Sequence, residues 1–158
     1  MKLDLASVPG RTGSIYPSPY KEMMAGRRSL RLGEAGGLTQ FGVNLVILSP
    51  GARSSLRHWH LHEDEFVMVT QGECTMYLDA GPTVMRAGDC AAFPAGREDG
   101  HCFVNHTEAE ARFLVIGTKA PREVATYSDV DMKVEMTPGE KGMAHFTYKD
   151  GSEWVGPR

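Results

Sequence analysis

Short runs of β-branched and aromatic residues, separated by turn residues, dominate the middle of the chain. One run covers Phe41 to Leu48 and ends at Ser49-Pro50-Gly51. Further runs cover residues 54–60, 65–70, 74–78, 83–86, 90–93, 101–104 and 111–117, with glycine or proline turns between most of them. Turn signals roughly every 8–12 residues are typical of an all-β sandwich or barrel. Because no helix-length periodic segment interrupts the series, an α/β fold is disfavoured.

The two ends of the chain carry a weaker pattern. We interpret residues 1–37 as an irregular arm with a short helix, which Ser18 caps, Pro19 begins and Gly26 ends. The basic segment 27–31 is expected to be a solvated or partner-covered surface rather than a phosphate site. Residues 38–120 form the predicted barrel. Residues 121–158 form an extension that packs on it, with edge strands expected at 124–127 and 133–136.

Composition and charge exclude several classes of protein. A length of 158 residues fits one domain, and 41% hydrophobic and 23% charged residues are ordinary for a globular protein. A net charge of -3 gives no basic footprint, so no nucleic-acid partner is expected. Neither a membrane-spanning apolar run nor the apolar core of a signal peptide is present.

The cysteines point to a reducing environment. Their number is odd, and Cys74, Cys90 and Cys102 form no Cys-x-x-Cys pair, which argues against a disulfide framework or a thiolate zinc site. We therefore expect three reduced side chains, mostly buried, and a cytoplasmic location.

A cluster of histidines and a glutamate is the main candidate for chemistry. His58 and His60 are two positions apart on a predicted strand, so both imidazoles project from one face. Glu65 begins the next strand. If the two strands lie side by side, its carboxylate can provide a third ligand to the same metal ion. A strand that returns along the barrel wall would aim His101 inward as a fourth ligand.

Two ordered motifs resemble the signatures of the cupin superfamily. The first runs from His58-x-His60 through Glu65 to Gly72, and the second runs from Gly88 through Pro94-x-Gly96 and His101 to Asn105. Two spacings depart from the tightest form of the pattern, at Gly51 and before His101, and both lie in turns where insertions cost little. A lone His-x-His pair would be a weak signal, but two motifs in order are specific.

The resemblance implies a double-stranded β-helix, or jelly-roll barrel. It also implies one divalent transition metal (zinc, iron, manganese or nickel) held near one mouth of the barrel by His58, His60, Glu65 and His101. Histidine and carboxylate ligands suit all of these metals and do not choose between them. A small-molecule substrate or ligand and a homodimer are the expected partners.

Function is open between two classes. The first is a metal-dependent enzyme that acts on a small oxygen-rich metabolite, like the sugar-phosphate isomerases or the dioxygenases among cupins. The second is a non-catalytic, metal-containing protein that binds or senses a small ligand. An isomerase also needs a general base, and the sequence identifies none; His62 and a metal-bound hydroxide are candidates for this role.

Several further residues have expected places. Phe103 shares parity with His101 and is predicted to line the substrate pocket, and Arg97 is a candidate to bind an anionic substrate group. Asn105 is expected to support the turn after its strand. The remaining expectations are packing or surface roles: an exposed loop for His62, structural or surface positions for His106 and His145, and an outward, dimer-forming face for Trp59, Phe66 and Met68.

Overall fold

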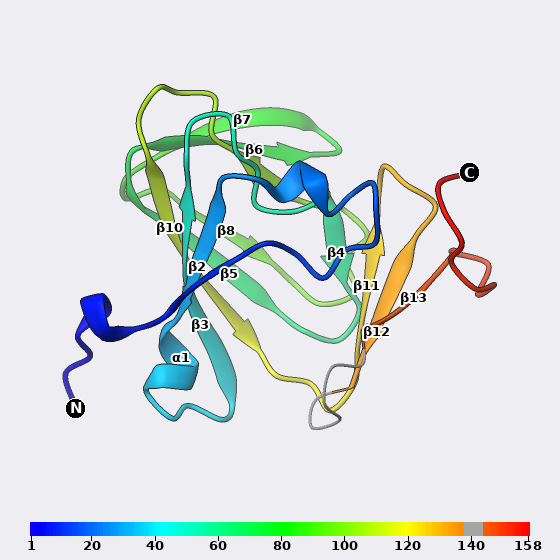
Figure 1. Ribbon diagram of the computed structural model, residues 1–158, viewed down its shortest axis with the longest axis horizontal. Helices are drawn as coiled ribbons and strands as arrows, with labels where there is room; N and C mark the ends of the chain where they lie inside the picture. The colour runs from blue at the N-terminus through cyan, green and yellow to red at the C-terminus, as the bar shows by residue number, and fades with distance from the viewer. Residues whose placement is uncertain (138–143) are drawn as a thin grey trace.

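Two facing layers of β-strands form the molecule, as in a jelly-roll barrel (Figure 1). The computed structural model describes residues 1–137 and 144–158. The first layer is a six-stranded sheet whose strands lie in the order β1 (Gly10–Thr12), β2 (Arg27–Arg31), β3 (Phe41–Leu48), β10 (Ala111–Thr118), β5 (Glu65–Gln71) and β8 (Cys90–Phe93). The predicted all-β jelly roll is confirmed.

The second layer consists of two smaller sheets. One contains β13 (Ala144–Thr147), β12 (Lys133–Met136), β11 (Glu123–Tyr127) and β4 (His58–His60) in that order, and the other contains β7 (Gly81–Arg86), β6 (Glu73–Leu78) and β9 (Cys102–Val104). Isolated bridges from His58 to His101 and from Arg53 to Val104 join β4 to the β9 side. The two smaller sheets therefore form one continuous layer, and they are joined where His58 meets His101.

The core lies between the two layers and follows the alternation of the sequence. On β5, Val67 and Val69 are fully buried, while Phe66 and Met68, which alternate with them, face outward. Phe113 on the adjacent β10 and Leu48 on β3 belong to the same buried cluster as these valines. Each fully buried aliphatic or aromatic side chain contributes roughly 1.5–3 kcal/mol. This core holds the strand ends that carry the histidine cluster.

The N-terminal segment is more regular than predicted. The arm supplies β1 and β2 to the six-stranded sheet, and the basic segment is the strand β2 paired with β3. In Figure 1 this segment (blue) crosses the molecule toward the C-terminal strands before it returns to enter β2. Val8 packs on the outer side of the sheet against Leu30, Leu45 and Ile47. The strand was not predicted because polar residues such as Arg27 and Ser29 interrupt its apolar pattern. Such residues are tolerated in β2 because it lies near the sheet edge, where only one side of a strand needs to be apolar.

Where the sequence predicts a helix that starts at Ser18, the structure has a shorter element. A 3-10 turn, η2 (Glu22–Met24), replaces the helix, and the Ser18 hydroxyl donates to the Glu22 carboxylate at 2.8 Å instead of capping a backbone amide. Gly26 follows with φ +78°, which is the conformation expected of the glycine that ends this element. The other short elements are η1 (Leu5–Ser7) and α1 (Leu32–Ala35). Within the described residues, no helix is long and apolar enough to cross a membrane.

The C-terminal strands form an integral part of the second layer. Strands were predicted at 124–127 and 133–136, and β11 and β12 confirm them. They are not edge strands, because β11 lies between β4 and β12, and β12 lies between β11 and β13. A second apolar cluster packs here around Met24, Leu56, Tyr127, Met132 and Val134. The extension thereby fixes β4, the strand that carries two of the predicted ligands.

Candidate functional site

Strand β4 places two imidazoles side by side. His58 and His60 project from the same face of the strand, as their spacing predicts, and their ring centroids are 4.9 Å apart. Pairing with β11 fixes the backbone of both residues, with His58 opposite Tyr127 and His60 opposite Ala125.

His101 joins the pair through its backbone and is held by an aromatic neighbour. Its N–H donates to the carbonyl of His58 at 2.9 Å, and it accepts the N–H of His58 at 3.1 Å. Its ring lies 5.1 Å from that of His58 and stacks on Phe93 at 3.6 Å with an interplanar angle of 11°. At 2% exposure, the His101 side chain has one fixed orientation toward the other two histidines.

Glu65 reaches the histidines from the opposite layer. Its strand does not lie beside that of His60, because β5 pairs with β10 and β8 whereas β4 pairs with β11. The carboxylate still closes the group: Oε1 is 3.1 Å from Nε2 of His101, and Oε2 is 3.7 Å from Nε2 of His60. The structure thus brings together all four predicted ligands.

Burial and hydrogen bonding leave His58 with a free lone pair. Its Nδ1 lies 2.9 Å from the carbonyl of Leu56, so Nδ1 carries the proton and Nε2 is unprotonated. Burial lowers the pKa of His58 to about 3, with smaller contributions from the neighbouring His60 and His101. The imidazole is therefore neutral near pH 7, which is the form that binds metal ions.

Carboxylates dominate the electrostatics of His60. Burial opposes its charged form, but Glu123 and Glu65 outweigh that effect and raise the pKa of His60. Burial alone would likewise raise the pKa of Glu65, but the hydrogen bond from His101 and the surrounding histidines hold it below its ordinary value. The site therefore favours an ionised carboxylate beside imidazoles in a buried position.

A second carboxylate group lies behind His60. Glu123 is 2% exposed, and its Oε1 is 3.7 Å from Nδ1 of His60. Ligand atoms of His60, Glu63 and Glu123 lie within 4.8 Å of one another. However, the Glu123 carboxylate already accepts the backbone N–H groups of Leu61 and His62, and Glu63 accepts that of Ala120. The set of His58, His60, Glu65 and His101 has more ligand atoms that are not already hydrogen-bonded to the backbone. It is therefore the better candidate to hold a metal.

A narrow hollow opens beside His60 and His101. It has a volume of about 60 Å³, enough for an ion and very few water molecules. Arg97, 69% exposed, and Asp99 line it, as do Trp59, Leu78 and Phe93. Arg97 therefore lies beside this hollow, and its role in binding an anionic substrate group stays a prediction.

The prediction that Phe103 lines the pocket is wrong. Phe103 is 2% exposed and packs in the barrel core, with its ring 4.9 Å from Phe113. Phe103 is two positions after His101 and therefore also points into the barrel interior, but it lies deeper than the hollow. Phe93, on the facing sheet, takes the lining position instead.

The predicted outward face divides between the two layers. Phe66 and Met68 are 39% and 37% exposed on the outer side of β5. Trp59 lies in the other layer, on β4, and lines the hollow, so it does not belong to that face. Strand parity alone could not show this, because it does not say which sheet each strand joins.

The remaining histidines and Asn105 lie where they were expected. His62 and His145 are exposed, and His106 is a surface residue whose Nε2 is 2.9 Å from the Tyr77 hydroxyl. Asn105 is fully buried, donates to the carbonyls of Leu48 and Ala109, and accepts from Thr107. The prediction that Asn105 supports the turn is confirmed.

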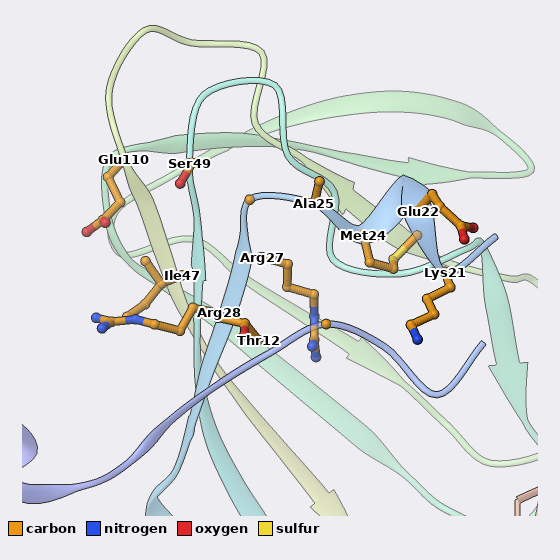
Figure 2. A pocket seen from close by; sticks show the side chains of 12 residues that line it. Thr12, Lys21, Glu22, Met24, Ala25, Arg27, Arg28, Ile47, Ser49 and Glu110 are labelled. Atoms are coloured by element: carbon orange, nitrogen blue, oxygen red, sulfur yellow. The ribbon is translucent and has the colours of Figure 1, made fainter. Parts of the chain in front are cut away.

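A separate hollow of about 500 Å³ lies between the N-terminal segment and β2. Figure 2 shows Lys21 and Arg27 with their nitrogen ends pointing toward the N-terminal segment, and Arg28 extending toward Ile47. Arg27 is half-buried, so the solvated surface predicted for this segment is only partly correct. This hollow shares no lining residue with the one beside His101.

Fold and site together define a class: a small jelly-roll barrel whose interior carries three histidines and a glutamate on facing layers. A model of the cupin domain matches residues 44–117, the segment that contains all four residues. The chain belongs to the cupin superfamily.

Three proteins illustrate what the chain is similar to. A sugar phosphate isomerase of the cupin superfamily from Silicibacter pomeroyi is 56% identical, with a TM-score of 0.94 over 98% of this chain and 97% of that one. A candidate sugar phosphate isomerase from Acidithiobacillus ferrooxidans is 25% identical, with a TM-score of 0.72 over 82% of this chain and 80% of that one. Protein SchB of Streptomyces halstedii is 31% identical over 112 residues, which are 70% of this chain and 79% of SchB.

Proposed function

We propose that the protein is a metal-dependent sugar-phosphate isomerase. The observation that carries this proposal is the 56% identity, along almost the whole chain, to the sugar phosphate isomerase from Silicibacter pomeroyi. The histidine and glutamate cluster supports it, because an isomerase of this kind needs a site that binds neighbouring oxygen atoms of a small substrate.

The residues fit a divalent metal. Nε2 of His58 is unprotonated because Nδ1 is committed to Leu56, and both ring nitrogens of His60 are buried without a hydrogen bond among the described residues. Unpartnered buried nitrogens are costly unless something binds them. His58, His60, Glu65 and His101 would hold the ion, by three imidazoles and one carboxylate. Bound there, a divalent metal would act as a Lewis acid on adjacent substrate oxygens.

Asp99 is the group best placed to move a proton. It lines the hollow, its Oδ1 accepts the N–H of Asp79 at 2.8 Å, and its Oδ2 faces Arg97 at 3.8 Å. We assign it the role of the base that takes the proton from the hydroxyl-bearing carbon beside the substrate carbonyl and returns it to the carbonyl carbon, while the proton of that hydroxyl passes to the former carbonyl oxygen. The carbonyl thereby moves by one carbon, with no added oxidant or reductant. The hydrogen bond from Asp79 holds the carboxylate in place for both transfers.

Arg97 would bind the phosphate group. Its side chain is 69% exposed at the rim, and the hollow beyond it is too small for a whole sugar phosphate. The substrate would therefore place its reacting oxygens inside and its phosphate outside. A guanidinium pairs with phosphate through two parallel hydrogen bonds, which fixes the orientation of the substrate.

The test is exchange and turnover with a panel of aldose and ketose phosphates in deuterated water, with zinc, iron, manganese or nickel supplied. We expect isomerisation with deuterium uptake at one carbon. The Asp99→Asn variant should lose about 10²–10⁴-fold in kcat with unchanged metal content. Arg97→Ala should raise KM for phosphorylated substrates and leave unphosphorylated analogues unaffected.

Two outcomes would contradict the proposal. Turnover that survives combined replacement of His58 and His101 by alanine would exclude a mechanism that uses this metal site. Tight binding of a sugar phosphate that is released unchanged, with every metal, would favour a non-catalytic binding or sensor protein instead.

Association into a homodimer through Phe66 and Met68 belongs to the same proposal. Both side chains are partly exposed on the outer side of β5. A dimeric mass in light scattering that falls to the monomer with Met68→Lys would support it, and a monomeric mass of the parent protein would contradict it.

A further inference from the structure

The His60 ring lies between two carboxylates from different parts of the chain. Nε2 faces Glu65 at 3.7 Å, and Nδ1 faces Glu123 at 3.7 Å. Both nitrogens are buried, and neither has a hydrogen bond among the residues that the structure describes. Both distances exceed those of an N–H···O bond, so a small movement of the ring would close either contact but not both equally well.

A neutral imidazole carries one proton, and its position decides which nitrogen can bind a metal. A buried N–H without an acceptor costs about 1–3 kcal/mol, so the proton of His60 must point at one of the two carboxylates. Nε2 faces Glu65, whose other carboxylate oxygen lies 3.1 Å from Nε2 of His101, so this nitrogen is directed at the candidate metal centre. A proton on Nε2 would block that centre. The proton therefore belongs on Nδ1, facing Glu123.

The surroundings of Glu123 hold it ready to accept this proton. Its side chain is 2% exposed. Its Oε1 accepts the N–H of Leu61 at 2.8 Å, and its Oε2 accepts that of His62 at 3.1 Å. These donors fix the carboxylate directly behind His60 and stabilise its negative charge. They also leave it little freedom to act as a metal ligand itself.

We propose that Glu123 is a positioning residue that accepts the Nδ1 proton of His60 and so presents the Nε2 lone pair to the metal. This inference rests on the proposed metal centre and adds to it. A carboxylate in this position also makes the imidazole a stronger ligand. Glu123 begins β11, so a strand outside the cupin motifs completes the metal centre.

The first test reads the proton directly and needs no variant. Long-range proton–nitrogen NMR spectra of the metal-free protein, recorded at alkaline pH where the imidazole is neutral, distinguish the two tautomers. We expect His60 to carry its proton on Nδ1. In Glu123→Ala the preference should be lost, and in Glu123→Gln, which retains one oxygen acceptor without the charge, it should weaken. A parent protein with the proton on Nε2 would overturn the proposal.

The second test measures zinc affinity by competition with a chelator. Glu123→Gln should bind zinc about 10–100-fold more weakly than the parent protein, as is usual when such a partner of a ligand is changed. Glu63→Gln is the matched control, because Glu63 lies in the same cluster but does not face Nδ1 of His60 at contact distance. Its affinity should be unchanged. Equal affinity of Glu123→Gln and the parent would refute the positioning role.

The same data separate failure of this inference from failure of the metal centre. If zinc binds the parent protein and His58→Ala abolishes binding, while Glu123→Gln has no effect, only the role of Glu123 is wrong. If Glu63→Gln and Glu123→Gln both abolish binding and His58→Ala does not, the metal lies among His60, Glu63 and Glu123. That result would overturn both proposals.

Discussion

The turn that follows β9 depends on one buried amide side chain. Asn105 is fully buried, and its Nδ2 donates to the carbonyls of Leu48 at 2.9 Å and Ala109 at 2.8 Å. Its Oδ1 accepts the backbone N–H and the hydroxyl of Thr107, at 3.0 and 2.8 Å. Asn105 therefore ties the end of β9 to the end of β3 and to the loop that leads into β10.

Replacing Asn105 by alanine removes all four hydrogen bonds. At a net value of about 1 kcal/mol for each bond, the variant should lose about 3–4 kcal/mol of unfolding free energy. For a domain of this size that corresponds to a fall in Tm of roughly 10 °C.

The assay is urea denaturation followed by circular dichroism, with chelator present so that metal binding does not contribute. Gln71→Ala is the control, because Gln71 is an exposed amide at the end of β5. It should change the unfolding free energy by less than about 0.5 kcal/mol. A loss below about 1 kcal/mol for Asn105→Ala would refute the view that its hydrogen bonds are made in the folded protein.

Two further predictions concern acidity and the core. In chelator-treated protein, the unfolding free energy should fall as pH drops from 6.5 toward 3, because the folded pKa of His58 is about 3 and the unfolded chain binds a proton that the folded one excludes. Denaturation at several pH values should show a shallower slope for His58→Gln, and equal slopes would contradict the assignment. Phe103→Ala should cost about 3–5 kcal/mol, whereas Phe41→Ala, the same change at an exposed position, should cost less than about 1 kcal/mol in the same assay.

The barrel and the grouping of the candidate ligands could be predicted from local sequence features. Alternation along β5 and turn residues between short strands indicate a barrel, and the two-residue spacing of His58 and His60 places both rings on one face. The position of His101 followed from the resemblance to cupins, and its backbone pairing with His58 agrees with it.

Long-range pairing could not be predicted in the same way. Glu65 reaches the histidines from the facing layer, and β2 joins a sheet although its sequence is basic, because pairing partners depend on the whole topology. Glu123 and Asp99 were missed for the same reason. A single acidic residue at a strand start or in a turn carries no periodic signal, and only the fold shows that each lies beside the histidine cluster.

The most direct test of the account is the metal content of the purified protein, measured by elemental mass spectrometry. The parent protein and His106→Ala, a surface histidine variant, should contain close to one divalent metal ion per chain. His58→Ala and His101→Ala should contain almost none. A parent protein that stays free of metal after exposure to zinc, iron, manganese and nickel in turn, or variants that retain it, would contradict the central claim that these residues form a metal centre.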